Sequence, residues 1–151
     1  MEIFKIADER YSKSIGASGT PNRWNKSGQF VAYAASSRSL ATLEMMARRS
    51  CIMPSKIVYK MMVLSFNDDD SLIRHIKASD LPQDWNKLNA YPKLQEIGSA
   101  WYSKQETLIL KVPSAIVPRE YNFVINTKHP LFSANVNLVR SEAYFWDERL
   151  L

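Results

Sequence analysis

The chain has 151 residues, of which 46% are hydrophobic and 23% are charged. These ordinary values exclude a disordered chain and predict one domain over residues 1–151 with a core of its own. No run of about 18 apolar residues occurs, which excludes a membrane-spanning helix. The N-terminus MEIFKIADER has early acids and no long apolar stretch, unlike a signal peptide. We therefore expect a soluble, cytoplasmic protein with no membrane partner.

The net charge limits the classes of ligand, and the single cysteine limits the chemistry of the chain. A net charge of +5 permits an anionic small molecule, a nucleic acid or an acidic partner as ligand. The basic residues are scattered, and no zinc-finger spacing or RNA-binding signature occurs. Cys51 is the only cysteine, so an internal disulfide is excluded, and it is interpreted as a plain thiol rather than a nucleophile.

The first third of the chain predicts a strand, a long loop, a second strand and a helix. Ser36 and Ser37 offer caps for a helix that runs to about Arg49, before Pro54. Leu40, Leu43 and Ala47 have helical spacing and predict its apolar face. The preceding elements are a strand at 1–7, a loop at 11–28 and a short buried strand at 30–35.

The rest of the chain predicts four strands and two helices joined by loops. A long strand at 56–66 is followed by the turn NDDDS, whose aspartates cap a short helix that contains His75. The remaining elements are a loop at 81–85, a helix at 91–104 and strands at 107–112, 122–126 and 138–145. This order predicts an α+β fold with mixed, mostly antiparallel sheets and flanking helices, rather than a regular βαβ series.

Glu44 lies at the edge of the predicted helix face. It is about 40° around the helix from Leu40 and about 60° from Ala47. A carboxylate at this boundary is partly desolvated and needs a partner. Spacing alone favours an ordinary boundary glutamate paired with a Lys or Arg, and a functional carboxylate is the alternative.

Three residues near the second strand are candidates for a ligand site. Arg23 lies in a loop, where its guanidinium either grips a phosphate with two parallel hydrogen bonds or anchors the loop. The indole of Trp24 packs under a ligand or under the loop. Tyr33 shares a strand face with Val31 and Ala35, as a pocket wall or as a core tyrosine.

The C-terminal half adds polar candidates at strand positions. Ser114 follows a strand without a G-x-S-x-G elbow, so it is a hydrogen-bond donor to a ligand or a turn serine. Asn122 and Asn126 lie four apart on one strand face and could bind polar ligand groups. His75 and His129 are isolated, which predicts no metal site. The chain also lacks the glycine-rich loops of Rossmann and P-loop proteins.

Five stretches occur together in the order typical of one family: RWNKSG, VAYAASSRSLATLE, LPQDW, IGSAWYSKQETLILKVPSAIVPREYNFVIN and KHPLF. The chain resembles the RES domain family, the toxin half of bacterial Xre-RES toxin–antitoxin pairs. The Arg, Glu and Ser of the family name fall on Arg23, Glu44 and Ser114. Two departures are Pro21-Asn22, where many members have Gly-Gly, and Lys5, where members often have an arginine.

The resemblance implies an ADP-ribosyltransferase-like fold and an enzyme with NAD as its substrate and no further cofactor. Such toxins cleave NAD at the nicotinamide–ribose bond, by water or by phosphate. Glu44 would bond a ribose hydroxyl and stabilise the cation that develops on the sugar. The roles implied for the other residues are Arg23 on the pyrophosphate, Tyr33 at the nicotinamide, Ser114 at the ribose or amide, and Lys5, Trp24 and Asn126 as further binding residues.

The implied partners are NAD and a cognate Xre-type antitoxin that blocks the pocket, with nucleic acid reached only through the antitoxin. A homodimer is left open, because Trp146 is an aromatic expected at the surface. Two other functions remain as alternatives. One is transfer of ADP-ribose to a cellular protein, and the other is a non-enzymatic module that binds an anionic ligand or nucleic acid, suggested by the +5 charge.

Overall fold

The computed structural model of the protein describes residues 1–49 and 56–151. Cys51 and Pro54, interpreted above as a plain thiol and a helix stop, lie outside the described residues. Within them, no helix is both long and apolar enough to cross a membrane.

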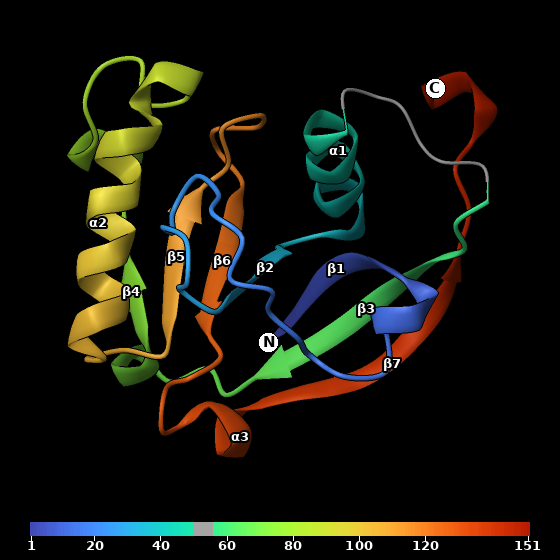
Figure 1. The fold of residues 1–151 in the computed structure, drawn as a ribbon, viewed down its shortest axis with the longest axis horizontal. Coiled ribbons are helices and arrows are strands. Elements are labelled where there is room, and N and C mark those ends of the chain that lie inside the picture. Colours follow the sequence, from blue (N-terminus) through green and yellow to red (C-terminus); the bar gives the residue numbers. More distant parts are fainter. Residues whose placement is uncertain (50–55) are drawn as a thin grey trace.

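One mixed sheet of seven strands organises the described residues (Figure 1). Its strands, in spatial order, are β4 (Ile73–His75), β5 (Ile109–Pro113), β6 (Tyr121–Asn126), β2 (Val31–Ala35), β1 (Glu2–Asp8), β3 (Tyr59–Phe66) and β7 (Val136–Tyr144). Only the pair β4–β5 is parallel, and the other pairs are antiparallel. The predicted α+β class with mostly antiparallel strands is confirmed.

The sheet nearly divides between β1 and β2. These two strands pair at a single position, Phe4 with Ala35. By contrast, β1 follows β3 along its whole length, and β2 follows β6 along its whole length. Figure 1 shows β1, β3 and β7 running at a steep angle to β5 and β6. The two half-sheets therefore diverge from one junction.

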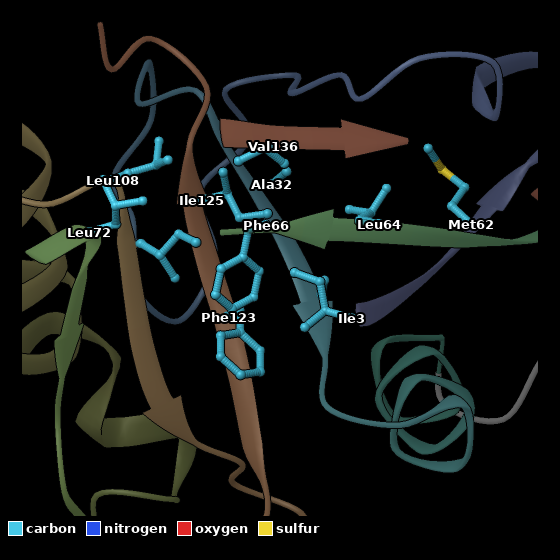
Figure 2. Close-up of a cluster of buried hydrophobic side chains, with 12 residues drawn as sticks. Ile3, Ala32, Met62, Leu64, Phe66, Leu72, Leu108, Phe123, Ile125 and Val136 are labelled. Carbon is cyan, nitrogen blue, oxygen red and sulfur yellow. The ribbon is translucent and has the colours of Figure 1, made fainter. Parts of the chain in front are cut away.

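The core follows this division. The largest apolar cluster joins side chains of both half-sheets, drawn in Figure 2: Ile3, Met62, Leu64 and Phe66 from one half, and Ala32, Phe123 and Ile125 from the other. Burying an Ile, Leu, Met or Phe side chain of this cluster stabilises the fold by about 1.5–3 kcal/mol. A second cluster lies under helix α1 (Arg38–Arg48) and a third under helix α2 (Tyr91–Lys104). Each helix thus covers one half-sheet.

Helix α1 begins as expected, because the Ser37 side chain accepts a hydrogen bond from the Leu40 amide. Its apolar face is shifted from the prediction. Leu40 and Ala41 are buried, but Leu43 is 40% exposed and Ala47 is exposed as well. The predicted face through Leu43 and Ala47 is therefore wrong. The helix packs on β1 and β2 through a neighbouring stripe, and Glu44 lies at its border.

Two further predictions differ from the structure. His75 lies in β4 and not in a helix, because Asp69 caps only a three-residue turn, Asp70–Leu72, before the chain pairs with β5. Trp146 is not the exposed aromatic expected at the C-terminus. It packs edge-on against Tyr59 and Tyr144, while the neighbouring Phe145 is 81% exposed. The short helix α3 (Phe132–Asn135) has no counterpart in the prediction.

Candidate active site

Two adjoining cavities lie against α1. The smaller is lined mainly from β1, β2 and α1, and the larger mainly from the loop at 22–24, α1 and the segment at 113–116. The larger has a volume of about 350 Å³ and the smaller about 60 Å³. Four residues line both of them: Tyr33, Glu44, Arg48 and Asn122. The larger volume lies at the lower end of the range of small-molecule sites. These two cavities, which share Glu44, together form the candidate active site and are called the cleft below.

Glu44 is held in this cleft through one of its two oxygens. Its Oε1 accepts hydrogen bonds from Ser114 Oγ at 2.8 Å and from Asn122 Nδ2 at 2.6 Å. Among the described residues, Oε2 has no hydrogen-bond partner, and no Lys or Arg forms an ion pair with the carboxylate. The partners are thus neutral groups instead of the cation that spacing alone favoured. One carboxylate oxygen is fixed, and the other is left for a ligand.

Ser114 holds the Glu44 carboxylate from a buried position. It is fully buried, and its Oγ accepts the amides of Ile116 and Val117, each at 3.1 Å, while it donates to Glu44. Ser114 is thus a turn serine, and its hydroxyl donates to the glutamate rather than directly into the cavities. It reaches the cleft through the carboxylate that it holds.

The loop that carries Arg23 is built around Asn25 and Tyr33. The Tyr33 hydroxyl accepts the Trp24 amide at 3.1 Å and donates to Asn25 Oδ1 at 2.6 Å. Asn25 is 1% exposed, and its Nδ2 contacts three backbone carbonyls in the same loop. Burial raises the pKa of the Tyr33 hydroxyl well above its usual value, so this hydroxyl remains a donor. Sequence reasoning missed Asn25, although it lies inside the RWNKSG motif.

Helix α2 fixes the same loop from the other side. Gln95 Nε2 donates to the Asn22 carbonyl at 2.8 Å. A Cβ at Gly98 would lie 1.7 Å from the Trp24 carbonyl oxygen, so only glycine allows this approach. The Arg23 guanidinium then lies over the Tyr91 ring, 4.6 Å from its centroid, with a long contact of 3.4 Å to the Trp85 carbonyl. Arg23 is therefore placed at the wall of the larger cavity.

Cations dominate the walls of the cleft. Arg23 and Arg48 line the larger cavity, and Lys5 and Arg48 line the smaller one. Glu44 is the acidic residue among the lining side chains. Burial and the nearby charge of Arg48 lower the pKa of Lys5 to about 8. The cleft therefore favours an anionic ligand that also presents a group to one carboxylate.

The two strand asparagines have different places. Asn122 lines both cavities and donates to Glu44, whereas the sequence indicated it only as an amide able to bind polar ligand groups. Asn126 lies at the opposite end of β6, fully buried, where it accepts the Lys128 amide, and the structure does not bring it to the cleft. Trp24 is buried as well, in the core under α2, but it also lines the larger cavity. Across residues 1–49 and 56–151, no three His, Cys, Asp or Glu side chains gather as metal ligands.

Comparison with known proteins decides the family. The model of the RES domain matches residues 3–147. The chain belongs to the RES domain family. The resemblance drawn from the sequence motifs is thereby confirmed.

Full-length relatives agree with this assignment. Toxin Res of Yersinia enterocolitica is 31% identical over 154 residues, which cover 99% of each chain. Toxin Res of Photorhabdus laumondii is 30% identical and covers 100% of this chain and 97% of its own. The Prs ADP-ribosylating toxin of Sphingobium sp. is 30% identical over 139 residues, 90% of this chain and 84% of that protein. These matches make the chain a toxin of the RES family.

A solved structure shares the fold. The crystal structure of the M. tuberculosis MbcT–MbcA toxin–antitoxin complex contains a chain that superposes with a TM-score of 0.74. The match covers 95% of this chain and 83% of that chain, at 15% sequence identity. The RES fold is therefore retained where few residues are shared.

Proposed function

We propose that this RES toxin consumes NAD by cleaving the bond between nicotinamide and ribose, with water or phosphate as the acceptor. The observation that carries the proposal is the half-anchored Glu44, which lines a cleft whose other charged residues are cations. NAD presents both complementary features, an anionic pyrophosphate and neutral ribose hydroxyls. The family assignment supports the same substrate.

Loss of nicotinamide leaves positive charge on the ribose in an oxocarbenium-like transition state. Nicotinamide departs as a neutral group, so a strong general acid is not needed. A carboxylate already oriented toward the sugar stabilises the developing charge without reorganising at the moment of reaction. Ser114 and Asn122 supply that orientation, since both hold Oε1 and leave Oε2 for a ribose hydroxyl.

Binding of the remaining parts of NAD falls to the cleft walls. The Arg23 guanidinium is fixed over Tyr91, and a planar fork of this kind bonds a pyrophosphate through two parallel N–H donors. Tyr33 lines both cavities, and in this proposal it borders the nicotinamide. Ser114 acts through Glu44, as a positioning residue.

Direct product analysis tests this proposal. Purified full-length protein is incubated with NAD, and free nicotinamide is quantified by chromatography. The proposal expects nicotinamide to accumulate together with free ADP-ribose, or with its phosphorylated form when phosphate is present. NAD that stays intact over many hours at micromolar enzyme would contradict it.

Transfer of ADP-ribose to a protein is the second candidate. It is favoured by the relative named Prs ADP-ribosylating toxin, which matches 90% of this chain. Glu44 would have the same role, because the same bond breaks. Labelled NAD distinguishes the two, since transfer leaves label on a protein band while hydrolysis or phosphorolysis leaves it on a small molecule.

We also propose an antitoxin as the partner, supported by the toxin–antitoxin complex that shares this fold. An Xre-type antitoxin that covers the cleft would block NAD entry. Coexpression should then restore growth to cells that express the toxin, and the purified complex should release no nicotinamide. A complex as active as the free toxin would refute the blocking role.

A further inference from the structure

Arg48 is a cation of the cleft to which the proposed reaction gives no role. It lies in the last turn of α1, is exposed and lines both cavities. It forms no ion pair within residues 1–49 and 56–151. A guanidinium at a cavity wall with its donors uncommitted is suited to bind an anion.

Glu44 and Arg48 have the spacing of an ion pair on a helix, but the structure does not pair them. A glutamate four residues before an arginine on a helix is the favourable order for an ion pair. In the structure the carboxylate turns instead to Ser114 and Asn122, through Oε1. The helix thus presents a negative and a positive group separately to the same cleft.

Lys5 adds a second cation from β1. It lines the smaller cavity together with Arg48, and the charge of Arg48 contributes to the lowered pKa of Lys5. Two cations in one cavity repel each other, and an anion bound between them offsets this repulsion. The volume of about 60 Å³ holds a few water molecules, which suits one phosphate group better than a nucleoside.

We propose that Lys5 and Arg48 form a phosphate-binding subsite in the smaller cavity, beside Glu44 and apart from Arg23. The inference deepens the proposed function and rests on it for the nature of the ligand. The C-terminal end of a helix repels anions, so the two side chains must supply the attraction themselves. The phosphate belongs either to the bound dinucleotide or to free inorganic phosphate.

Calorimetric titration of the full-length protein tests the subsite without turnover. ADP-ribose and inorganic phosphate are titrated separately at pH 7 and constant ionic strength. Arg48→Gln is compared with Arg49→Gln, which removes the same charge at the next position of the chain, outside the residues that line the two cavities. Thermal unfolding shows that each variant is folded.

A dissociation constant for ADP-ribose that rises about tenfold or more in Arg48→Gln only would support the subsite and assign it to the dinucleotide. The same rise for inorganic phosphate alone would support it and assign it to a free phosphate. Changes below about twofold for both ligands, or equal effects of Arg49→Gln, would overturn it.

A pH profile separates direct binding from a structural role. The titratable groups that line the smaller cavity with Lys5 are Tyr33 of β2 and Glu44 and Arg48 of α1. On the neighbouring strand β3, Lys5 pairs with the uncharged Met62. Affinity for ADP-ribose should fall as the pH rises through about 8, where Lys5 loses its charge. Arg48→Gln should move this fall to higher pH, because it removes a charge that lowers the Lys5 pKa. An unmoved profile would count against the subsite.

These readouts are independent of catalysis. If the purified protein releases no nicotinamide from NAD but binds anions through Arg48, the proposed function fails and the subsite stands. If nicotinamide is released and Arg48→Gln binds both anions normally, the subsite fails alone.

Discussion

Asn122 is a residue of the cleft whose side chain orients Glu44. It is half-buried and gives Glu44 a 2.6 Å hydrogen bond, whereas the other donor, Ser114, also accepts two backbone amides. Removing Ser114 would therefore disturb both the turn and the glutamate, at about 1–3 kcal/mol for its buried partners. Asn122 allows the orientation of Glu44 to be tested with less effect on folding.

We expect Asn122→Ala to lower kcat for nicotinamide release by about tenfold, because Glu44 Oε1 loses one of two donors. KM should change little, and the melting temperature should stay within a few degrees of wild type. Asn137→Ala, at an exposed position of β7, is the control and should leave both constants unchanged. A kcat equal to wild type in Asn122→Ala would show that this hydrogen bond does not orient the carboxylate.

At the scale of elements, α2 places the Arg23 loop by close contact. The helix approaches the Trp24 carbonyl at Gly98, where a Cβ would lie 1.7 Å from the oxygen. The same helix supplies Gln95 to the Asn22 carbonyl and Tyr91 to the Arg23 guanidinium. The cleft wall and the packing of α2 are therefore coupled.

Gly98→Ala should lower the unfolding free energy by about 1–3 kcal/mol, because α2 must move away from the loop. KM for NAD should rise at the same time, since Arg23 moves with its loop. Gly16→Ala is the matched control, because a Cβ there meets nothing within 4 Å. Urea unfolding and steady-state kinetics measure both effects. Equal stability of the two variants would contradict the close packing at Gly98.

Long elements with a clear period could be predicted from the sequence. The helix at 91–104 has the bounds predicted, because Leu94 and Trp101 repeat at helical spacing and Pro92 favours its first turn. The strand β4 could not be predicted, since three residues carry no period and only their pairing with β5 defines them. Tertiary context likewise selected the stripe of α1 that is buried.

The candidate site could be predicted only in part, for a similar reason. Arg23, Tyr33 and Glu44 were identified, and all three line the same cavity. The roles of Asn25, Asn122 and Arg48 depend on which loops and strands meet, and spacing along the chain does not contain that information. The resemblance to the RES family supplied the grouping that spacing alone left open.

For the whole molecule, the smaller cavity at the division of the sheet imposes a cost on folding. Lys5 lies at the division, where burial and Arg48 lower its pKa to about 8 from the 10.5 of an unperturbed lysine. Between these two values the unfolded chain binds more protons than the folded one, so stability rises with pH in that window. The Lys5 charge thus lowers the stability of the fold at neutral pH, as is common for side chains that serve ligand binding.

Lys5→Met should be more stable than wild type at pH 7, and it should lack the rise in unfolding free energy between about pH 8 and 10. Its affinity for NAD or ADP-ribose should fall, because the cation is lost from the cleft. Urea unfolding across this pH range, with calorimetric titration at pH 7, checks both results. A wild-type curve that is flat or falls over this window would contradict the lowered pKa of Lys5.

The most direct measurement for the central claim is the rate of nicotinamide release by wild type, Glu44→Gln and Glu96→Gln. Glu96 lies exposed on α2, away from the cleft, so its variant controls for the loss of one carboxylate. The account expects Glu96→Gln to match wild type and Glu44→Gln to be slower by at least ~10²-fold while folding normally. A Glu44→Gln protein that releases nicotinamide at the wild-type rate would contradict it.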